Sequence, residues 1–285
     1  MEPLPPINYL RLSVTDRCNL RCVYCTYWQD WQKLPAGEIL RYEELLRLAA
    51  VAAAGGIRKI RITGGEPLVR RGLVGFLQDL NRIPGIDQVC LTTNGVMLQE
   101  LAPALYSAGL RHLNVSLDTL RRDRYRHITG KDKLSAVMAG LARAASLGFH
   151  PVKINCVVLR GINDDEILAI AQLAREHPFQ VRFIELMPTA SRTWWQRHFL
   201  PMAEVRQRCG PGPIGTINPG TDIRACQNFL FAGISGRGGL HQPHERAPLP
   251  HLQPPASFER RQSEALPLGG EGAGSQGAIT SGRFR

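Results

Sequence analysis

Short apolar runs rich in β-branched residues recur along the chain, and longer amphipathic stretches separate them. The runs are typical of strands, and the stretches, several of which close on a glycine or near a proline, are typical of helices. The predicted strands are 9–14, 59–64, 88–94, 112–118, 152–159 and 181–187, and the helical stretches include 42–56, 98–109 and 164–177, the last with Asn163 as its expected N-cap. Six β/α units in series imply a parallel sheet with right-handed crossovers.

The positions of the polar residues distinguish a doubly wound sheet from a sheet curled into a partial barrel. Several predicted strands end in side chains able to bind or react, namely Thr63 to Glu66, Thr92 with Asn94, Ser116 with Asp118, and Glu185 with Met187. In a β/α barrel the carboxyl ends of the strands converge on one mouth, where the active site lies. We therefore expect the fold class to be α/β, as a partial (β/α)6 barrel.

The character of the chain changes near residue 225. Residues 225–285 contain 10 Gly and 6 Pro among 61 positions, and no Lys, Asp, Tyr, Trp or Met. This composition, without a periodic apolar face, is typical of a disordered segment. The sequence thus predicts a barrel domain over residues 1–224 and a tail of low order over residues 225–285.

Length and charge limit the class of protein. A chain of 285 residues with 44% hydrophobic residues suits one catalytic domain with an appendage. It shows neither a secretory leader nor an apolar segment as long as a membrane span, so we expect a cytoplasmic protein with no membrane partner. The formal net charge of +11 suits either nucleic acid or a small polyanionic substrate. Because no RNA-binding signature or basic run is present, we expect no nucleic-acid partner.

Three cysteines within eight residues suggest metal chemistry: Cys18, Cys22 and Cys25, spaced C-x3-C-x2-C in the loop after the first predicted strand. Three thiolates cannot close a tetrahedral zinc site without a fourth ligand. They can bind three irons of a 4Fe-4S cluster and leave the fourth iron open for chemistry. A zinc site completed by a distant His or Cys is the alternative, but the spacing and the aromatic Tyr24 favour the cluster.

Beyond the cysteines, the sequence resembles radical S-adenosylmethionine (SAM) enzymes. C-x3-C-x2-C with an aromatic residue before the last cysteine is their signature, and TGGEPLVRR at 63–71 resembles their glycine-rich SAM-binding turn. Six segments in order resemble the GTP 3',8-cyclase family, which opens molybdenum cofactor biosynthesis: LRLSVTDRCNLRCVYC, IRITGGEPLVRR, LTTNG, LNVSLDT, GINDDEI and RFIELMP. CTYW after the last ligand departs from the Cys-Met-Pro expected there.

The resemblance implies a radical SAM lyase that converts GTP to 3',8-cyclo-7,8-dihydroguanosine triphosphate. A 4Fe-4S cluster would bind SAM at its open iron, and an electron donor protein would reduce it. A homodimer is compatible with this interpretation. The implied site residues are Cys18, Cys22 and Cys25 for the cluster, Tyr24, Gly65, Ser116 and Met187 for SAM, and Arg11, Arg61, Thr92 and Lys153 for GTP.

The basic members of the implied GTP set also have a physical case. Arg11, Arg61 and Lys153 lie on predicted inner strands, where an unpaired cation is costly. A triphosphate carries several negative charges and would pair with all three at once. The alternative for each is a structural ion pair, for instance with Glu66.

The tail departs from the family. Family members carry a second three-cysteine cluster, spaced C-x2-C-x13-C beside an Arg-rich stretch that binds guanine, whereas residues 225–285 contain only Cys226. Three leucines have the missing spacing: Leu249, Leu252 and Leu266. Each precedes Pro or Gln, whose codons begin with C, so a leucine codon ending in TG reads TGC, cysteine, one base later. We hypothesise a one-base frameshift near residues 222–228, which leaves one cluster where the family has two; a native disordered tail is the alternative.

Two other functions are compatible with part of the sequence. The chain could be a radical SAM enzyme that acts on another substrate, such as a peptide. It could instead be a degenerate, non-catalytic iron–sulfur protein. The intact TGGEP turn and Met187 argue against the latter, because such a protein has no need of a SAM site.

Overall fold

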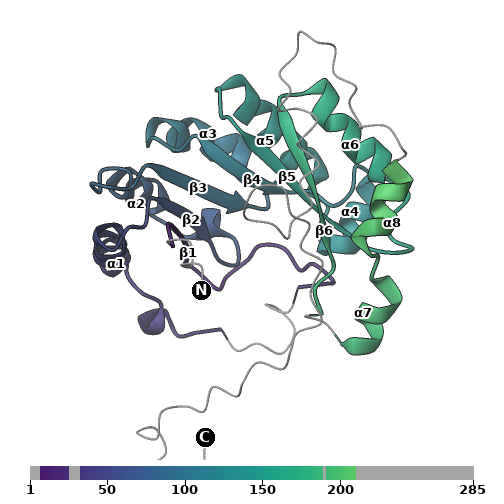
Figure 1. Cartoon of the computed structure of the whole chain (residues 1–285), viewed down its shortest axis with the longest axis horizontal. Coiled ribbons are helices and arrows are strands. Elements are labelled where there is room, and N and C mark those ends of the chain that lie inside the picture. The colour runs from purple at the N-terminus through teal and green to yellow at the C-terminus, as the bar shows by residue number, and fades with distance from the viewer. Residues whose placement is uncertain (1–6, 26–32, 189–190, 210–285) are drawn as a thin grey trace, which may run out of the picture. The chain divides into compact units, whose positions relative to one another are not determined.

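Strands and helices alternate along the part of the chain that the computed structural model describes, residues 7–25, 33–188 and 191–209 (Figure 1). The strands are β1 (Tyr9–Ser13), β2 (Lys59–Thr63), β3 (Gln88–Thr93), β4 (His112–Ser116), β5 (Val152–Val158) and β6 (Phe179–Glu185). The α-helices are α1 (Tyr42–Ala54), α2 (Leu73–Leu80), α3 (Leu98–Ser107), α4 (Arg122–Thr129), α5 (Leu134–Ser146), α6 (Ile167–Glu176), α7 (Arg192–His198) and α8 (Met202–Cys209), and the short 3-10 helices are η2 (Ala36–Glu38) and η3 (Pro67–Val69).

The six strands form one parallel sheet in the order β1-β2-β3-β4-β5-β6. Each strand pairs with its neighbours in sequence, whereas a doubly wound sheet would place β1 in its interior. Within the described residues the order ends at β1 and β6, so the barrel is open along one side. The prediction of a partial (β/α)6 barrel is confirmed. The last strand begins two residues earlier than predicted, because Phe179 and Gln180 pair with Val152 and Lys153 of β5.

One face of the sheet packs against the helices. Ile60 and Ile62 of β2, Leu91 of β3 and Leu113 of β4 are completely buried on this face. Figure 1 shows α1, α2, α3, α5 and α6 along the outer side of the curved sheet, as right-handed crossovers between sequence neighbours require. The hydrophobic core therefore lies between the sheet and this layer of helices.

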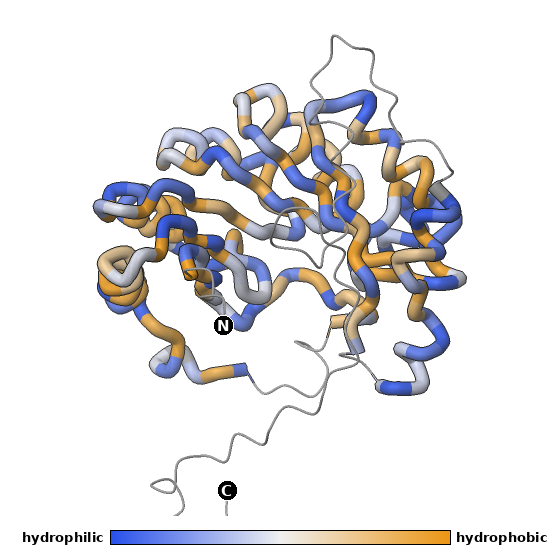
Figure 2. Tube along the Cα trace, viewed as in Figure 1, coloured by the Kyte–Doolittle hydropathy of each residue, from blue (hydrophilic) through white to orange (hydrophobic). Residues whose placement is uncertain are grey.

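The alternate strand positions face the concave side of the sheet, and Figure 2 shows the resulting change between polar and apolar residues along the strands. The register places two rows of these residues side by side: Arg11, Arg61 and Cys90 in one, and Thr92, Asn114 and Lys153 in the other. The implied GTP residues therefore share one face, although they come from four different strands.

The helix predicted to start near Asp164 starts later, and the N-cap assigned to Asn163 is wrong. Helix α6 begins at Ile167. The Asn163 side chain instead donates to Asp118 O at 2.7 Å and Val157 O at 2.9 Å, because it fills a buried gap between two loops. Tertiary hydrogen bonds have outweighed the local capping preference.

The predicted tail and its boundary at residue 224 lie outside the described residues and stay predictions. Among the helices described, none has both the length and the apolar composition needed to cross a membrane.

Candidate functional site

The loop after β1 carries the predicted cluster ligands, and backbone hydrogen bonds fix it at two places. Val14 N donates to Thr63 O at 2.9 Å beside β2, and Val23 N donates to Ile128 O at 2.9 Å near the end of α4. All three thiols are half-buried: Cys18, Cys22 and Cys25. The loop thus presents all three at the carboxyl edge of the sheet, where the sequence predicts the barrel mouth.

The chemistry of these three ligands fits a cluster. A cubane binds each cysteine to a different iron, so three thiolates hold it and leave one iron open, whereas a tetrahedral zinc ion needs a fourth ligand. Burial raises the pKa of Cys22, and the charges of Asp118, Cys25 and Cys18 raise it further. Coordination to iron as a thiolate relieves this electrostatic penalty.

The glycine-rich turn after β2 packs directly on the cysteine loop. Gly65 N donates to Thr15 O at 2.7 Å, and Glu66 N donates to Arg17 O at 2.8 Å. A Cβ on Gly65 would lie 2.3 Å from Arg17 O, and Gly64 has a φ of +147°. No other residue fits this backbone approach. Both glycines are therefore required to seat the loop, whatever Gly65 contributes to SAM binding.

Glu66 does not pair with the concave-face cations, so that sequence alternative is wrong. Its buried carboxylate accepts hydrogen bonds from Asn94 N at 2.6 Å, Thr93 Oγ1 at 2.7 Å and Leu68 N at 3.0 Å. Burial raises the pKa of Glu66, and these bonds lower it. Asn94 Nδ2 also donates to Asn19 Oδ1 at 2.7 Å in the cysteine loop. Glu66 therefore connects the ends of β2 and β3 beneath the predicted cluster.

A buried carboxylate holds Tyr24, which lies between the last two cysteines. Tyr24 OH donates to Asp118 Oδ2 at 2.6 Å, and Val157 N donates to Asp118 Oδ1 at 2.8 Å. Burial raises the pKa of Asp118 to about 6, while the bonds from Tyr24 and Val157 lower it. Because the phenol hydroxyl is engaged, a contact between Tyr24 and SAM would use the ring face or the backbone.

The other predicted SAM residues lie along the same carboxyl edge. Ser116 is the last residue of β4 and is half-buried, and Gly65 follows β2. Met187 follows β6 and is 61% exposed. The fold therefore brings residues from β2, β4 and β6 to the edge that also carries the cysteine loop.

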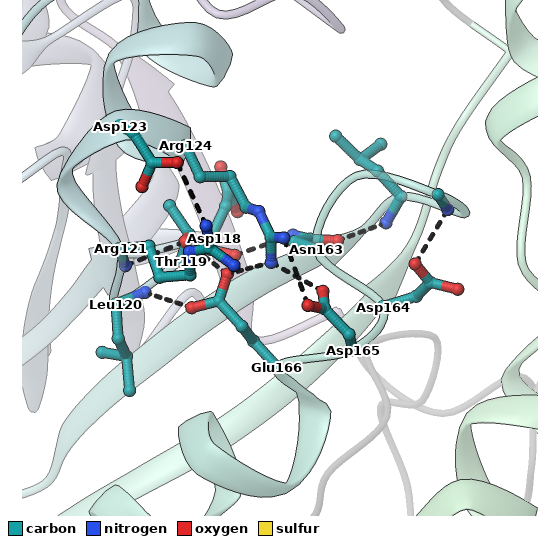
Figure 3. A network of polar contacts seen from close by, with 12 residues as sticks. Asp118, Thr119, Leu120, Arg121, Asp123, Arg124, Asn163, Asp164, Asp165 and Glu166 are labelled. Carbon is teal, nitrogen blue, oxygen red and sulfur yellow. Dashed lines mark hydrogen bonds and ion pairs between the residues drawn. The ribbon is translucent and has the colours of Figure 1, made fainter.

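A buried ion pair anchors the loop after β4, which contains Asp118 (Figure 3). Glu166 accepts from Thr119 Oγ1 at 2.6 Å, from Leu120 N at 2.8 Å and from Arg124 Nη1. Arg124 Nη1 also donates to Asp165 Oδ1 at 2.6 Å on the solvent side. The side chains of Arg124 and Glu166 are 16% and 8% exposed, whereas that of Asp165 is 60% exposed.

This difference in exposure predicts different mutational costs for the two carboxylates. Glu166→Ala removes the acceptor of two buried donors and leaves the Arg124 charge in a poorly solvated site, so we expect a loss of about 3–5 kcal/mol in the free energy of unfolding. The matched Asp165→Ala change removes an exposed ion pair and should cost about 0–1 kcal/mol. Urea denaturation of the metal-free protein measures both losses, and equal values would contradict the assigned roles.

Five cations face the concave side of the sheet: Arg11, Lys59, Arg61, Lys153 and Arg182. Within the described residues none of them forms an ion pair. Arg61 instead donates from Nη1 to Thr92 Oγ1 at 3.5 Å and from Nε to Tyr9 OH. A structural ion pair, the alternative drawn from the sequence, is therefore not formed there.

The electrostatics of this face favour a bound anion. Burial and the charges of Arg182, Lys59 and Arg61 together lower the pKa of Lys153 to about 8. Burial and the charge of Arg61 together lower the pKa of Arg182 to about 10. The Nε and Nη2 atoms of Arg182 are buried without a hydrogen-bond partner in the described structure. A polyanion on this face would satisfy both the charges and the donors.

The sequence interpretation missed Lys59 and Arg182 as members of this cluster. Lys59 precedes Arg61 by two positions, and Arg182 lies at a polar position of the alternating β6 strand. Strict alternation could have assigned both to the concave face, because residues two apart on a strand share a side.

Comparison with known proteins agrees with this geometry. Residues 12–174 match the Radical SAM superfamily. The GTP 3',8-cyclase of Pelotomaculum thermopropionicum is 52% identical over 200 residues, which are 70% of this chain and 62% of that protein. The GTP 3',8-cyclases of Geobacter sulfurreducens and Moorella thermoacetica are 48% and 45% identical, over 82% and 83% of this chain and 72% and 74% of theirs. The chain thus spans 62% to 74% of the length of these relatives.

Solved structures share the fold at low sequence identity. HydG, a maturase of the [FeFe]-hydrogenase, superposes with a TM-score of 0.56 at 16% identity, over 70% of this chain and 47% of HydG. Streptococcus suis SuiB bound to S-adenosylmethionine gives a TM-score of 0.55 at 15% identity, over 70% of this chain and 46% of SuiB. Identities this low establish only that the barrel fold is shared. The matches at 45–52% identity establish the family. The chain belongs to the radical SAM superfamily and, within it, to the GTP 3',8-cyclase family.

Proposed function

We propose that this chain is a radical SAM GTP 3',8-cyclase, the lyase that converts GTP to 3',8-cyclo-7,8-dihydroguanosine triphosphate at the start of molybdenum cofactor biosynthesis, and that loss of the second cluster impairs this activity in the chain as printed. The observation that carries the proposal is a three-thiol loop at the edge of a concave face whose five cations form no ion pair within the described residues, in a chain 48% identical to a relative of that name. The loop suits a reductive cofactor and the cations suit a polyanionic substrate, and the reaction needs the two together.

The cysteine loop would hold the cofactors. Cys18, Cys22 and Cys25 are the proposed ligands of one 4Fe-4S cluster, which when bound supplies the electron that splits SAM. Gly65, Ser116 and Met187 are proposed to contact SAM together with Tyr24, whose orientation Asp118 sets. Asp118 accepts the Tyr24 hydroxyl at 2.6 Å, so the ring cannot turn away without breaking a buried hydrogen bond.

The concave cations would bind the triphosphate of GTP. Arg11, Arg61, Thr92 and Lys153 form the proposed set, and Lys59 and Arg182 extend it. Arginine forks pair with phosphate oxygens through two parallel bonds, and lysine supplies a compact charge. A bound triphosphate would also raise the lowered pKa of Lys153, which keeps that side chain protonated. Contacts from several strands restrict the ribose relative to the SAM-derived radical.

Further features of the enzyme follow from the same proposal. The printed sequence has one cluster motif, so we propose one cluster in this chain where the family has two. An electron donor protein must reduce the cluster, and thiolate ligands with an oxygen-sensitive cofactor suit the reducing cytoplasm. We propose a cytoplasmic enzyme, with a homodimer as its assembly.

Arg61→Ala tests the nucleotide site. Each charge-assisted bond to phosphate contributes about 1.5–3 kcal/mol, so we expect GTP affinity to fall on the order of 10- to 100-fold with SAM affinity nearly unchanged. Isothermal titration with the anaerobically reconstituted protein measures both. The control is Arg82→Ala, which removes an exposed arginine after α2. Equal losses for GTP and SAM would indicate a folding defect and not a nucleotide site. Stimulation of SAM cleavage by peptides but not by GTP would argue for another substrate.

A further inference from the structure

The back of the cysteine loop lies against the end of α4. Arg21 N donates to Thr129 O at 2.8 Å, and Val23 N donates to Ile128 O at 2.9 Å, on either side of Cys22. A Cβ on Gly130 would lie 3.2 Å from the Cβ of Arg21, so the turn after α4 packs closely on the loop. The end of α4 is therefore the part of the outer surface adjacent to a proposed cluster ligand.

This surface is strongly basic. Residues 121–133 contain six Lys or Arg and two Asp. Each aspartate already forms an ion pair with an arginine of the same segment: Asp123 with Arg121 at 3.2 Å, and Asp132 with Arg122 at 2.6 Å. Arg124 points inward to Glu166.

Four exposed cations remain, and we call them the α4 basic patch: Arg21, Arg126, Lys131 and Lys133. None of the four forms an ion pair within the described residues. Arg126 and Lys133 both act on the pKa of Asp132, so they lie around the same point of the surface. Arg21 Nη1 donates to Cys18 O at 2.8 Å and places one cation of the patch on the cysteine loop itself.

We propose that the α4 basic patch is the docking surface for an acidic one-electron carrier protein that reduces the cluster. The inference rests on the proposed function, which consumes one electron for each SAM cleaved. A positive surface steers a negative partner and raises its association rate by about 10- to 1000-fold at low salt. Small, charge-directed interfaces are typical of transient electron-transfer complexes. A carrier bound here has a short path to the cluster, because Arg21 and Cys22 are adjacent in the chain.

The carrier is the only electron source that reduction of the cluster requires. One electron leaves the reduced carrier, so an anionic flavin hydroquinone becomes the neutral semiquinone, or a ferrous ion of an iron–sulfur carrier becomes ferric. The cluster that Cys18, Cys22 and Cys25 would hold would take up this electron and change its charge from 2+ to 1+. The carrier then dissociates in its oxidised form, and the patch is free for the next reduced copy.

The test is the rate at which reduced flavodoxin, an acidic flavoprotein, reduces the cluster of the reconstituted full-length chain. In Arg126→Glu/Lys131→Glu we expect the second-order rate constant at low ionic strength to fall about tenfold. The difference between this variant and the unmodified chain should disappear in about 0.5 M salt, because salt shortens the distance over which the charges interact. The matched control is Arg143→Glu/Arg175→Glu, with the same charge change on exposed residues in the last turns of α5 and α6. Those turns lie at the amino edge of the sheet, away from the cysteine loop. The control should stay within about twofold of the unmodified chain.

Photoreduced 5-deazariboflavin, a small uncharged reductant, separates docking from damage to the cluster. Both variants should accept electrons from it at the rate of the unmodified chain and then cleave SAM. If the glutamate pair loses its cluster, Arg126→Gln/Lys131→Gln replaces it, with an expected reduction in the flavodoxin rate of about threefold. Equal flavodoxin rates in the patch and control variants would overturn the docking surface and leave the proposed function intact. The same conclusion would follow if the patch variants lost affinity for an RNA oligonucleotide without any change in electron transfer.

Discussion

Replacing Cys22 by alanine is expected to abolish cluster assembly and reductive SAM cleavage together. Two remaining thiolates, Cys18 and Cys25, cannot hold a cubane that needs three protein ligands to leave one iron open. Anaerobic reconstitution of the unmodified chain should give about four irons per chain and a broad charge-transfer absorption, and the Cys22→Ala variant should give neither. 5'-Deoxyadenosine formation in the presence of a chemical reductant should fall to background.

The control for this experiment is Cys90→Ala. Cys90 is 2% exposed on β3 and belongs to the sheet and not to the cysteine loop. Its loss removes a small buried side chain, so iron content and SAM cleavage without GTP should be retained. A chain in which Cys18, Cys22 and Cys25 are all replaced should bind no iron; stoichiometric iron in that protein would show that the cluster lies elsewhere.

Restoring the hypothesised reading frame after residues 222–228 is expected to switch on GTP cyclisation. The radical derived from SAM must remove one chosen hydrogen from the ribose, and that selectivity depends on holding the purine in place. The concave cations are proposed to bind the triphosphate, which would leave the base unrestrained at the other end of the nucleotide. The family resemblance implies that a second cluster and its arginines hold the base in intact members. The printed tail carries neither, because Leu249, Leu252 and Leu266 stand at the cysteine positions.

Iron content and product formation provide the measurements. The chain as printed should hold about four irons and the restored chain about eight, since each three-cysteine site holds one cubane. Only the restored chain should form the cyclised nucleotide. A restored chain whose three reinstated cysteines are changed to serine is the matched control and should return to about four irons without cyclisation. Cyclase activity from the 285-residue chain as printed would refute the frameshift hypothesis and make the second cluster dispensable.

The sequence by itself determined the architecture and the cofactor loop. Alternating apolar positions with helical stretches between them specify β/α units, and the polar strand ends distinguish a barrel from a doubly wound sheet. The C-x3-C-x2-C spacing is local, so Cys18, Cys22 and Cys25 need no tertiary contact to be recognised. Local periodicity can be read directly along the chain, which is why the barrel prediction is confirmed. The assignment of the three cysteines to a cluster can be read from their spacing in the same way, and it stays a prediction.

Only the tertiary structure decided which polar groups meet. Asn163 had the local pattern of an N-cap, yet its amide fills a gap beside Asp118, 45 residues away. Glu66 was a candidate partner for the cations, yet it accepts from three donors at the ends of neighbouring segments. A side chain with several compatible partners has no preference that can be read along the chain, because burial and distance select the partner after the sheet has formed.

The cations of the concave face also show what the sequence reveals and what only the tertiary structure reveals. Each of its cations is unremarkable in sequence, since an isolated Arg or Lys on a strand is as compatible with an ion pair as with a ligand. The sheet curvature brings Arg182 of β6 near Arg61 of β2, so the charge of Arg61 lowers the pKa of Arg182, and both charges lower the pKa of Lys153. Alternation along a strand specifies the face on which a residue lies. The curvature that brings cations from distant strands together, and so favours a bound anion, exists only in three dimensions.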